Sequence, residues 1–305
     1  MPLPASCSPK PTLSFSSDRI VPGNRIQLIS GSVSMGGRHR HQRILVVTSS
    51  PACLTFRASD DSAEMSHRAN RKFDITALVK TGLHRHIIDI HVAVPYYRLL
   101  IGQKKRYPNS SKWRCLYWGL PSERFHFAQD RSFYYCEDLF ADTSRENIRM
   151  ALAFQREVIN RIIPEVRPDL VHCWDWFTGL IPSACRSFGI PCVFSCCSVN
   201  TARLLLSDIE DCGIDAGAFW QNCYYSRMPR NYEETRESNP VDLLLSAVFA
   251  ADHVTIDAPE FLDQIGEGIG QPGDPVLQRE LQIKYRSGCF SGRSPVEAYE
   301  RLLCY

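Results

Sequence analysis

The sequence predicts an α/β domain built on a doubly wound, Rossmann-like parallel sheet. Short apolar runs, the pattern of buried parallel strands, occur at Ile44–Thr48 and Ile87–Val94. Strand and helix patterns then alternate from residue 143 to residue 256, which is typical of a parallel sheet covered by helices. A chain of 305 residues with 44% hydrophobic content is large enough for a complete core.

The composition also excludes several classes of function. A net charge of +2 gives no strong field, so we expect neither nucleic acid nor an acidic membrane as a partner. No apolar run approaches the length that spans a bilayer. The thirteen cysteines are irregularly spaced, without a paired Cys-x-x-Cys or a matching histidine pair. We therefore expect reduced core thiols, no metal site and no cofactor.

The first residues differ from the rest of the chain. Residues 1–42 are rich in Ser and Pro, contain the single acid Asp18 and end in a basic run. Such a composition predicts either a disordered leader or an organelle targeting peptide. The expected compartment is accordingly the cytoplasm, or the plastid if this leader is a transit peptide.

The domain itself is expected over residues 43–265, and its first half contains a helix and a hairpin. Apolar side chains recur at helical spacing over residues 73–86, between the first two strands. Residues 113–118 and 124–127 are short runs with many aromatic residues, which we interpret as the two arms of a β-hairpin.

The alternating region opens with a helix whose start is marked by a capping box. Thr143 stands three residues before Glu146, apolar residues then lie near one face, and Pro164 is expected to end the helix. The strands and helices after it are expected at residues 170–172, 180–188, 192–196, 240–250 and 254–256.

After residue 265 the pattern weakens. Residues 266–273 are rich in glycine and predict a flexible linker. Ser294 precedes Pro295, and this pair favours the start of a helix. We therefore expect segment 266–305 to be a Gly-rich linker with a short helical tail.

The strongest functional signal lies at Arg167–Leu180. A short predicted strand runs into His172, Asp175 and Trp176, and the ligands of open α/β sheets bind at the carboxyl ends of strands. This placement predicts a sugar or nucleotide site. The structural alternative is that the tryptophans are core anchors and that Asp175 caps the following helix.

This stretch resembles the His-x-His-Asp-Trp-x-x-Gly-Leu segment of bacterial glycogen synthases and plant starch synthases. The resemblance continues, in the family's order, at Ile87–Tyr97, Gly189–Ser195 and Ala250–Phe261. It implies the N-terminal half of a GT-B glycosyltransferase of the hexosyltransferase type. The implied reaction transfers glucose from ADP-glucose to the non-reducing end of an α-1,4-glucan, so the expected partners are ADP-glucose and the glucan acceptor.

The resemblance also assigns roles to residues. Asp175 matches a family residue near the transferred glucose and is the candidate catalytic residue. His172 and Trp176 match further positions of the same segment as substrate-binding candidates, with a satisfied buried histidine and core packing as the alternatives. Either Tyr134 or Tyr135 matches a tyrosine of the acceptor region.

Two more substrate-binding candidates stand where the sequence departs from the family. Cys197 occupies the position of a His that contacts the sugar, and a thiol cannot reproduce the imidazole contact. Asp242 aligns with the Asn of an Asn-x-x-Lys segment whose Lys is replaced by Leu245. The family's glycine-rich loop after the first strand is replaced by Ser49–Thr55.

Three interpretations follow from the retained scaffold and the lost site residues. The chain is part of a glucan synthase and needs a separate C-terminal, nucleotide-binding half, so that alone it has little or no activity. Alternatively, it is a non-catalytic relative that binds glucan or a true synthase. The third interpretation is a truncated or decayed coding sequence.

Overall fold

The computed structural model describes six segments of the chain, residues 42–49, 88–97, 122–135, 143–256, 274–291 and 296–303. Several predicted features lie outside them, namely the leader before Gln42, the helix at 73–86, the first hairpin arm at 113–118 and the linker at 266–273.

A seven-stranded sheet, all of whose strand pairs are parallel, organises these segments, in the order β3-β2-β1-β4-β5-β8-β9. The prediction of a doubly wound parallel sheet is therefore confirmed. The order reverses between β1 and β4, which pair through Val47 and Cys173 near their carboxyl ends. The strands are β1 (Gln42–Val47), β2 (Ile88–Pro95), β3 (Phe125–Ala128), β4 (Leu170–Trp174), β5 (Cys192–Cys196), β8 (His253–Ile256) and β9 (Phe290–Ser291).

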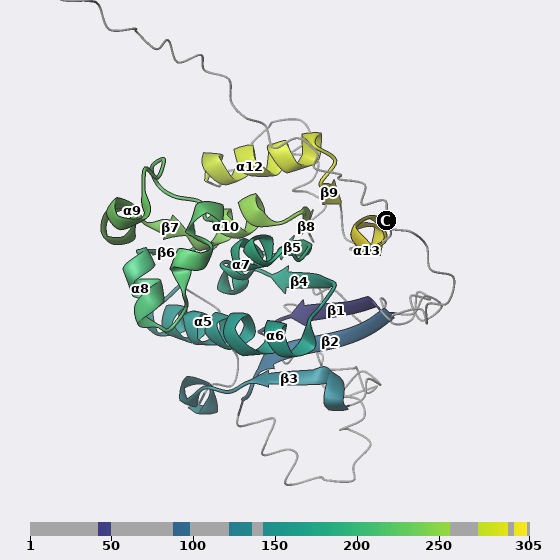
Figure 1. The fold of residues 1–305 in the computed structure, drawn as a ribbon. Coiled ribbons are helices and arrows are strands. Elements are labelled where there is room, and N and C mark those ends of the chain that lie inside the picture. The colour runs from purple at the N-terminus through teal and green to yellow at the C-terminus, as the bar shows by residue number, and fades with distance from the viewer. Residues whose placement is uncertain are drawn as a thin grey trace, which may run out of the picture. The chain divides into compact units, whose positions relative to one another are not determined.

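Helices surround this sheet (Figure 1). The α-helices are α5 (Arg145–Glu157), α6 (Ile163–Val166), α7 (Ile181–Phe188), α8 (Leu206–Asp211), α9 (Tyr232–Ser238), α10 (Leu243–Ala250), α12 (Pro275–Arg286) and α13 (Val296–Leu303). A two-stranded antiparallel ribbon joins β6 (Arg203–Leu204) to β7 (Val241–Asp242). Figure 1 shows α8, α9 and this ribbon on the side toward which the arrowheads of β1 and β4 point.

The helix before β4 differs from its prediction at both ends. Its N-cap is Ser144 rather than Thr143, because the Ser144 Oγ accepts the Asn147 N–H at 3.3 Å. Pro164 does not end it: a π turn at Val158–Ile162 leads into α6, where the proline occupies the first turn. Proline has no backbone N–H, so its place just after the π turn leaves no donor without an acceptor.

Three further elements differ from the sequence-based expectations. The segment interpreted as the second hairpin arm forms β3, which pairs in parallel with β2, whereas the other expected arm lies outside the described residues. The expected helix at 240–250 begins only at Leu243, because Val241 and Asp242 first form β7. The weakly patterned tail supplies α12, capped by Asp274 before Pro275, and β9, which pairs with β8.

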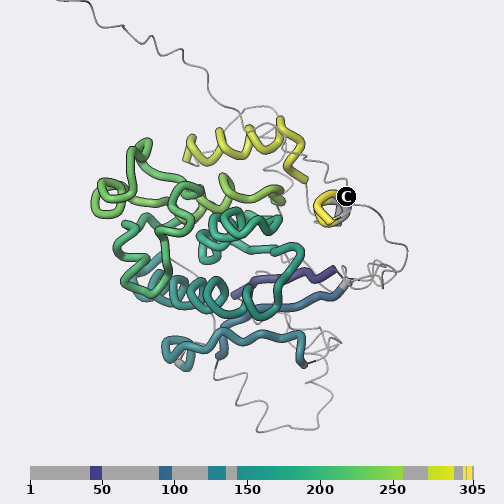
Figure 2. The backbone as a smooth tube through the Cα atoms, viewed as in Figure 1, coloured from purple at the N-terminus to yellow at the C-terminus, as the bar shows by residue number. Residues whose placement is uncertain are grey.

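The alternating apolar side chains of the strands form two core clusters, one on each face of the sheet. Leu45, Val171 and Phe194 belong to the cluster that α5, α6, α7 and α10 cover. Ile44 and Val193 belong to the other cluster, which includes Tyr299 of α13. Figure 2 follows the chain from the purple β1 to the yellow α13, which contacts β4.

The cysteines of the described segments agree with the expectation of reduced core thiols. None of them forms a disulfide within the part of the chain that the structure describes. Burial raises the pKa of Cys223 to about 12, so its thiol remains protonated and unreactive at neutral pH. The buried ones are Cys173, Cys185, Cys192, Cys196 and Cys223.

Gly179 lets the start of α7 approach α10 closely. A Cβ built on it would lie 2.4 Å from the carbonyl oxygen of Leu243 and 2.8 Å from that of Trp176. Its own backbone is right-handed, with φ −59° and ψ −28°, so the conformation itself does not require glycine. The close approach of the two backbones is therefore the reason for glycine here.

We expect Gly179→Ala to destabilise the fold by about 3 kcal/mol, the upper range for overpacked cores, because the obstructing atoms are backbone. Gly189→Ala is the matched control. That glycine has φ +69° with no atom within 4 Å of an added Cβ, so it should cost only about 1 kcal/mol of left-handed strain. Urea denaturation measures the unfolding free energy of both variants, and an equal loss of stability in the two would contradict the steric argument.

Candidate functional site

The carboxyl ends of β1 and β4 border the point where the strand order reverses. In open α/β sheets this crevice is the place where ligands bind. The loop after β1 is held there by β2, because the Thr48 N–H donates to the Ala93 carbonyl at 3.1 Å. The buried Tyr97 hydroxyl also donates to the Ser49 carbonyl. The edge is thus structurally fixed on the β1 side.

Asp175 follows β4 at this edge in an unusual backbone conformation. Its φ of 58° and ψ of 175° lie in a region that residues other than glycine rarely adopt. Its N–H donates to the Ser195 carbonyl at 2.9 Å, and its own carbonyl accepts the Thr178 hydroxyl at 2.9 Å. Such strain costs about 1–3 kcal/mol and clusters at functional sites.

The Asp175 carboxylate is fixed as firmly as its backbone. Its Oδ1 accepts the Trp176 N–H and the Ser198 hydroxyl, each at 2.9 Å. Burial raises the pKa of Asp175, and the hydrogen bonds from Trp176 and Ser198 offset part of that rise. The expected capping role is therefore present. A contact between this carboxylate and a ligand stays a prediction.

A second carboxylate, Asp242, lies nearby in the fold at the start of α10. It is 2% exposed and accepts the Leu245 N–H at 3.0 Å, the Thr201 hydroxyl at 2.6 Å and the Arg203 Nε at 3.1 Å. With these three partners its geometry supports helix capping. A contact between Asp242 and substrate stays a prediction.

The loop after β5 connects the two carboxylates. Ser198 binds Asp175, and three residues later Thr201 binds Asp242. Neither residue was a candidate from the sequence. The available signal was their position directly after the predicted strand at 192–196, because the carboxyl ends of parallel strands share one edge of the sheet.

His172 lies within β4 and is completely buried. Its Nδ1 is hydrogen-bonded to the Tyr299 hydroxyl, and its Nε2 lies 2.8 Å from the Ser195 Oγ. The Ser195 hydroxyl in turn lies 2.6 Å from the Thr255 Oγ1. Burial, aided by the charge of His253, lowers the pKa of His172 to about 3. This geometry is that of a neutral, satisfied core histidine.

The tryptophans of the same segment pack against the protein. Trp176 is 1% exposed and lies edge-on to Phe177 within the core, with ring centroids 6.4 Å apart. Trp174 stacks on the His172 imidazole at a centroid distance of 3.8 Å. Core packing is accordingly the role that the geometry supports for Trp176, and a sugar contact stays a prediction.

The tyrosine candidates lie at the same sheet edge but apart from Asp175. Tyr134 follows β3, is 39% exposed and contacts the ring of Tyr96. Because β3 and β4 are three strand spacings apart, about 14 Å separates those strands. Tyr135 ends the same 3-10 turn. Cys197 is exposed beside Ser198, with its thiol 3.8 Å from the Ser195 carbonyl oxygen.

Two further properties concern only the described segments. No group of three or more His, Cys, Asp and Glu side chains in them has a geometry suited to a metal ion. None of their helices combines the length and the apolar character that crossing a membrane would require.

Comparisons with known proteins place these features in a family. Residues 74–279 match the family described as the starch synthase catalytic domain. A glycogen synthase of Desulfitobacterium hafniense is 26% identical over 114 residues, 33% of this chain and 24% of that protein. A glycogen synthase of Halalkalibacterium halodurans is 24% identical over 216 residues, 63% of this chain and 41% of that protein. The chain thus spans less than half the length of these relatives.

Among solved structures, the similarity is lower. The glycosyltransferase SsfS6 of Streptomyces sp. SF2575 has a TM-score of 0.25 at 14% identity, over 58% of this chain and 44% of that one. A UDP-N-acetylglucosamine 2-epimerase has a TM-score of 0.33 at 12% identity, over 76% of this chain and 44% of that one.

Acidification should destabilise the fold through His172. Its pKa falls from the usual 6.5 to about 3 on folding, so the unfolded chain binds this proton more tightly. The contribution of neutral His172 to the unfolding free energy is complete above pH 6.5 and is lost as the pH falls toward 3. The loss is at most about 1.4 kcal/mol per pH unit. We expect His172→Gln to flatten the pH dependence of the unfolding free energy, measured with urea between about pH 7 and about pH 5.

Tyr299→Phe is the comparison for this effect. It removes the hydroxyl partner of His172 but leaves the imidazole buried. It should lower stability by about 1 kcal/mol at every pH and keep the wild-type slope. If the His172→Gln variant kept the wild-type pH dependence of the unfolding free energy, His172 would be excluded as the source of that dependence.

Proposed function

Because the chain belongs to the starch synthase catalytic domain family, we propose that it takes part in transferring glucose from ADP-glucose to the non-reducing end of an α-1,4-glucan. The observation that carries this proposal is the strained, half-buried Asp175 at the carboxyl end of β4, next to the reversal of strand order. Its catalytic role and the identity of donor and acceptor belong to the proposal. So does the expected cytoplasmic location.

The chemistry of Asp175 suits the sugar side of this reaction. Glycosyl transfer develops positive charge on the sugar, as glycoside hydrolysis does. A carboxylate that is already fixed by Trp176 and Ser198 stabilises such charge without reorganising. In the ground state the same group accepts hydrogen bonds from sugar hydroxyls. We propose that Asp175 does both for the transferred glucose.

The nucleotide side requires groups that the described site does not contain. A leaving diphosphate is stabilised by cations and backbone N–H donors. Within the described segments, neither Arg nor Lys hydrogen-bonds or pairs with Asp175, whose recorded side-chain partners are Trp176 and Ser198. We therefore propose that a separate nucleotide-binding half, which completes the GT-B arrangement, supplies these contacts.

A second candidate function is a non-catalytic relative that binds glucan or a true synthase. The observation that favours it is the loss of family residues around Asp175, with Cys197 in place of a His and Leu245 in place of a Lys. The two candidates share a sugar contact only where the relative binds glucan and not a synthase. They differ in whether glucose is transferred.

Substitutions of Asp175 test this proposal. Asp175→Asn keeps an oxygen that can accept from Trp176 and Ser198, so the fold should remain within about 1 kcal/mol of wild type. Asp175→Ala should lose about 1–2 kcal/mol, because it also removes the cap. Asp175→Asn should weaken the retardation of the chain in glycogen-containing native gels, since the neutral amide is a poorer acceptor for sugar hydroxyls.

Labelled ADP-glucose and glycogen separate catalysis from binding. We expect the chain alone to incorporate no glucose, and incorporation to appear only with a nucleotide-binding half, in wild type but not in Asp175→Asn. Glycogen binding without incorporation under both conditions would support the non-catalytic relative. Unchanged binding and turnover in a folded Asp175→Asn chain would leave Asp175 with a structural role only.

A further inference from the structure

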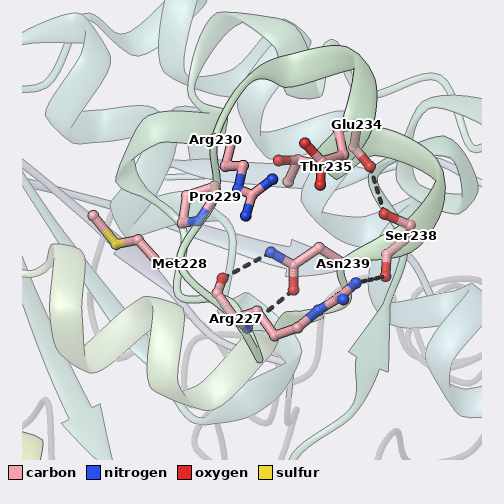
Figure 3. Close-up of a pocket in the computed structure, with 8 residues that line it drawn as sticks. All are labelled: Arg227, Met228, Pro229, Arg230, Glu234, Thr235, Ser238 and Asn239. Carbon is pink, nitrogen blue, oxygen red and sulfur yellow. Dashed lines mark hydrogen bonds between the residues drawn. The ribbon is translucent and has the colours of Figure 1, made fainter.

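A surface pocket of about 330 Å³ lies beside α9, away from the residues that contact Asp175. Eight residues line it, and Figure 3 shows them drawn from α9, the turn before it and the residue after it: Arg227, Met228, Pro229, Arg230, Glu234, Thr235, Ser238 and Asn239. We propose that this pocket binds the phosphate group of a small phosphorylated molecule. The proposal is independent of glucan synthesis.

Arg230 is the first group that points to an anion. Its side chain is exposed, and it forms no ion pair within the described part of the chain. In Figure 3 its guanidinium points into the space between Thr235 and Asn239. Arg236 on the same helix differs, because it binds Glu210 at 2.6 Å and also pairs with Glu237. Arg230 thus keeps its charge and its donors for a ligand.

Arg227 supplies a second guanidinium from the other end of the turn. One of its N–H groups donates to the Ser238 carbonyl at 2.8 Å, which positions the side chain along the pocket. A guanidinium carries five N–H donors, so this single bond leaves others available. Two guanidinium groups in one pocket match the several oxygens and the charge of a phosphate.

The turn that carries both arginines is fixed before any ligand arrives. Asn239 is 4% exposed, and its amide bridges the Arg227 backbone, donating to the carbonyl at 2.7 Å and accepting the N–H at 3.1 Å. Asn231 caps α9 by accepting the Glu234 N–H at 2.8 Å. Pro229 restricts the backbone between the arginines. Little backbone entropy is therefore lost on binding.

The charge and size of the pocket define the ligand further. Glu234 is the acidic member of the lining, so the two arginines leave a net charge of about +1 for an anion. A volume of about 330 Å³ is at the lower end for small-molecule sites, which excludes a large ligand but exceeds the needs of a simple carboxylate. Met228 at the rim is 91% exposed and offers apolar contact to an organic group.

Calorimetric titration of the full chain tests this inference. The probes are glycerol 3-phosphate, inorganic phosphate and, as the neutral control, glycerol. We expect saturable binding of the phosphates and none of glycerol. Arg230→Gln should weaken phosphate binding about tenfold or more, because it removes a charge-assisted hydrogen bond. Glu234→Gln should strengthen it, because it removes the opposing charge.

Arg279→Gln is the matched control, because it removes the same charge from an exposed position of α12 outside the pocket. Circular dichroism verifies that each variant is folded. Tighter binding of glycerol 3-phosphate than of inorganic phosphate supports a phosphomonoester as the occupant, and equal binding supports free phosphate. Absence of saturable binding, or equal weakening in Arg230→Gln and Arg279→Gln, would overturn the proposal.

Discussion

The backbone of Asp175 is the constraint on which the arrangement of the sheet edge depends. Left-handed φ with extended ψ is unfavourable for an aspartate and persists only where neighbouring contacts over-determine it. The Asp175 N–H donates to the Ser195 carbonyl, and the Asp175 carbonyl accepts the Thr178 hydroxyl. The carboxylate accepts hydrogen bonds from Trp176 and Ser198. The turn at the end of β4 therefore cannot relax without breaking contacts to β5 and to its own continuation. Its conformation directs the carboxylate toward the loop after β5.

A buried network of hydrogen-bonded side chains fixes the strand that leads into this turn. His172 of β4, Ser195 of β5 and Thr255 of β8 are hydrogen-bonded in sequence across three adjacent strands. The hydrogen bond between His172 and Tyr299 extends this network to α13 on one face of the sheet. Because every described member is both buried and partnered, the network specifies one arrangement of strands and helix instead of an adaptable apolar contact. Asp175 therefore follows a strand whose position is fixed by buried hydrogen bonds.

The sequence anticipated those elements whose signal is local. Runs such as Ile44–Thr48 predict buried parallel strands, because both faces of such strands are covered and the apolar residues are consecutive. Ser144 could not be distinguished from Thr143 as the N-cap, since both side chains can accept the hydrogen bond and only the backbone conformation decides. Ser198 and Thr201 were missed because their partners lie 23 and 41 residues away. The pairing of β3 with β2 is equally non-local.

The environment of Asp175 limits what this edge of the sheet can contribute on its own. Burial raises the pKa of Asp175, and the groups that offset the rise are neutral donors, Trp176 and Ser198. Sugar hydroxyls are donors of the same kind, so a bound sugar would favour the ionised carboxylate further. A diphosphate would be repelled by that carboxylate unless cations accompany it. Under our proposal, this edge of the sheet therefore contacts the sugar and not the nucleotide. In our proposal this asymmetry is what makes a second half necessary for transfer, whereas sugar binding alone requires only this one.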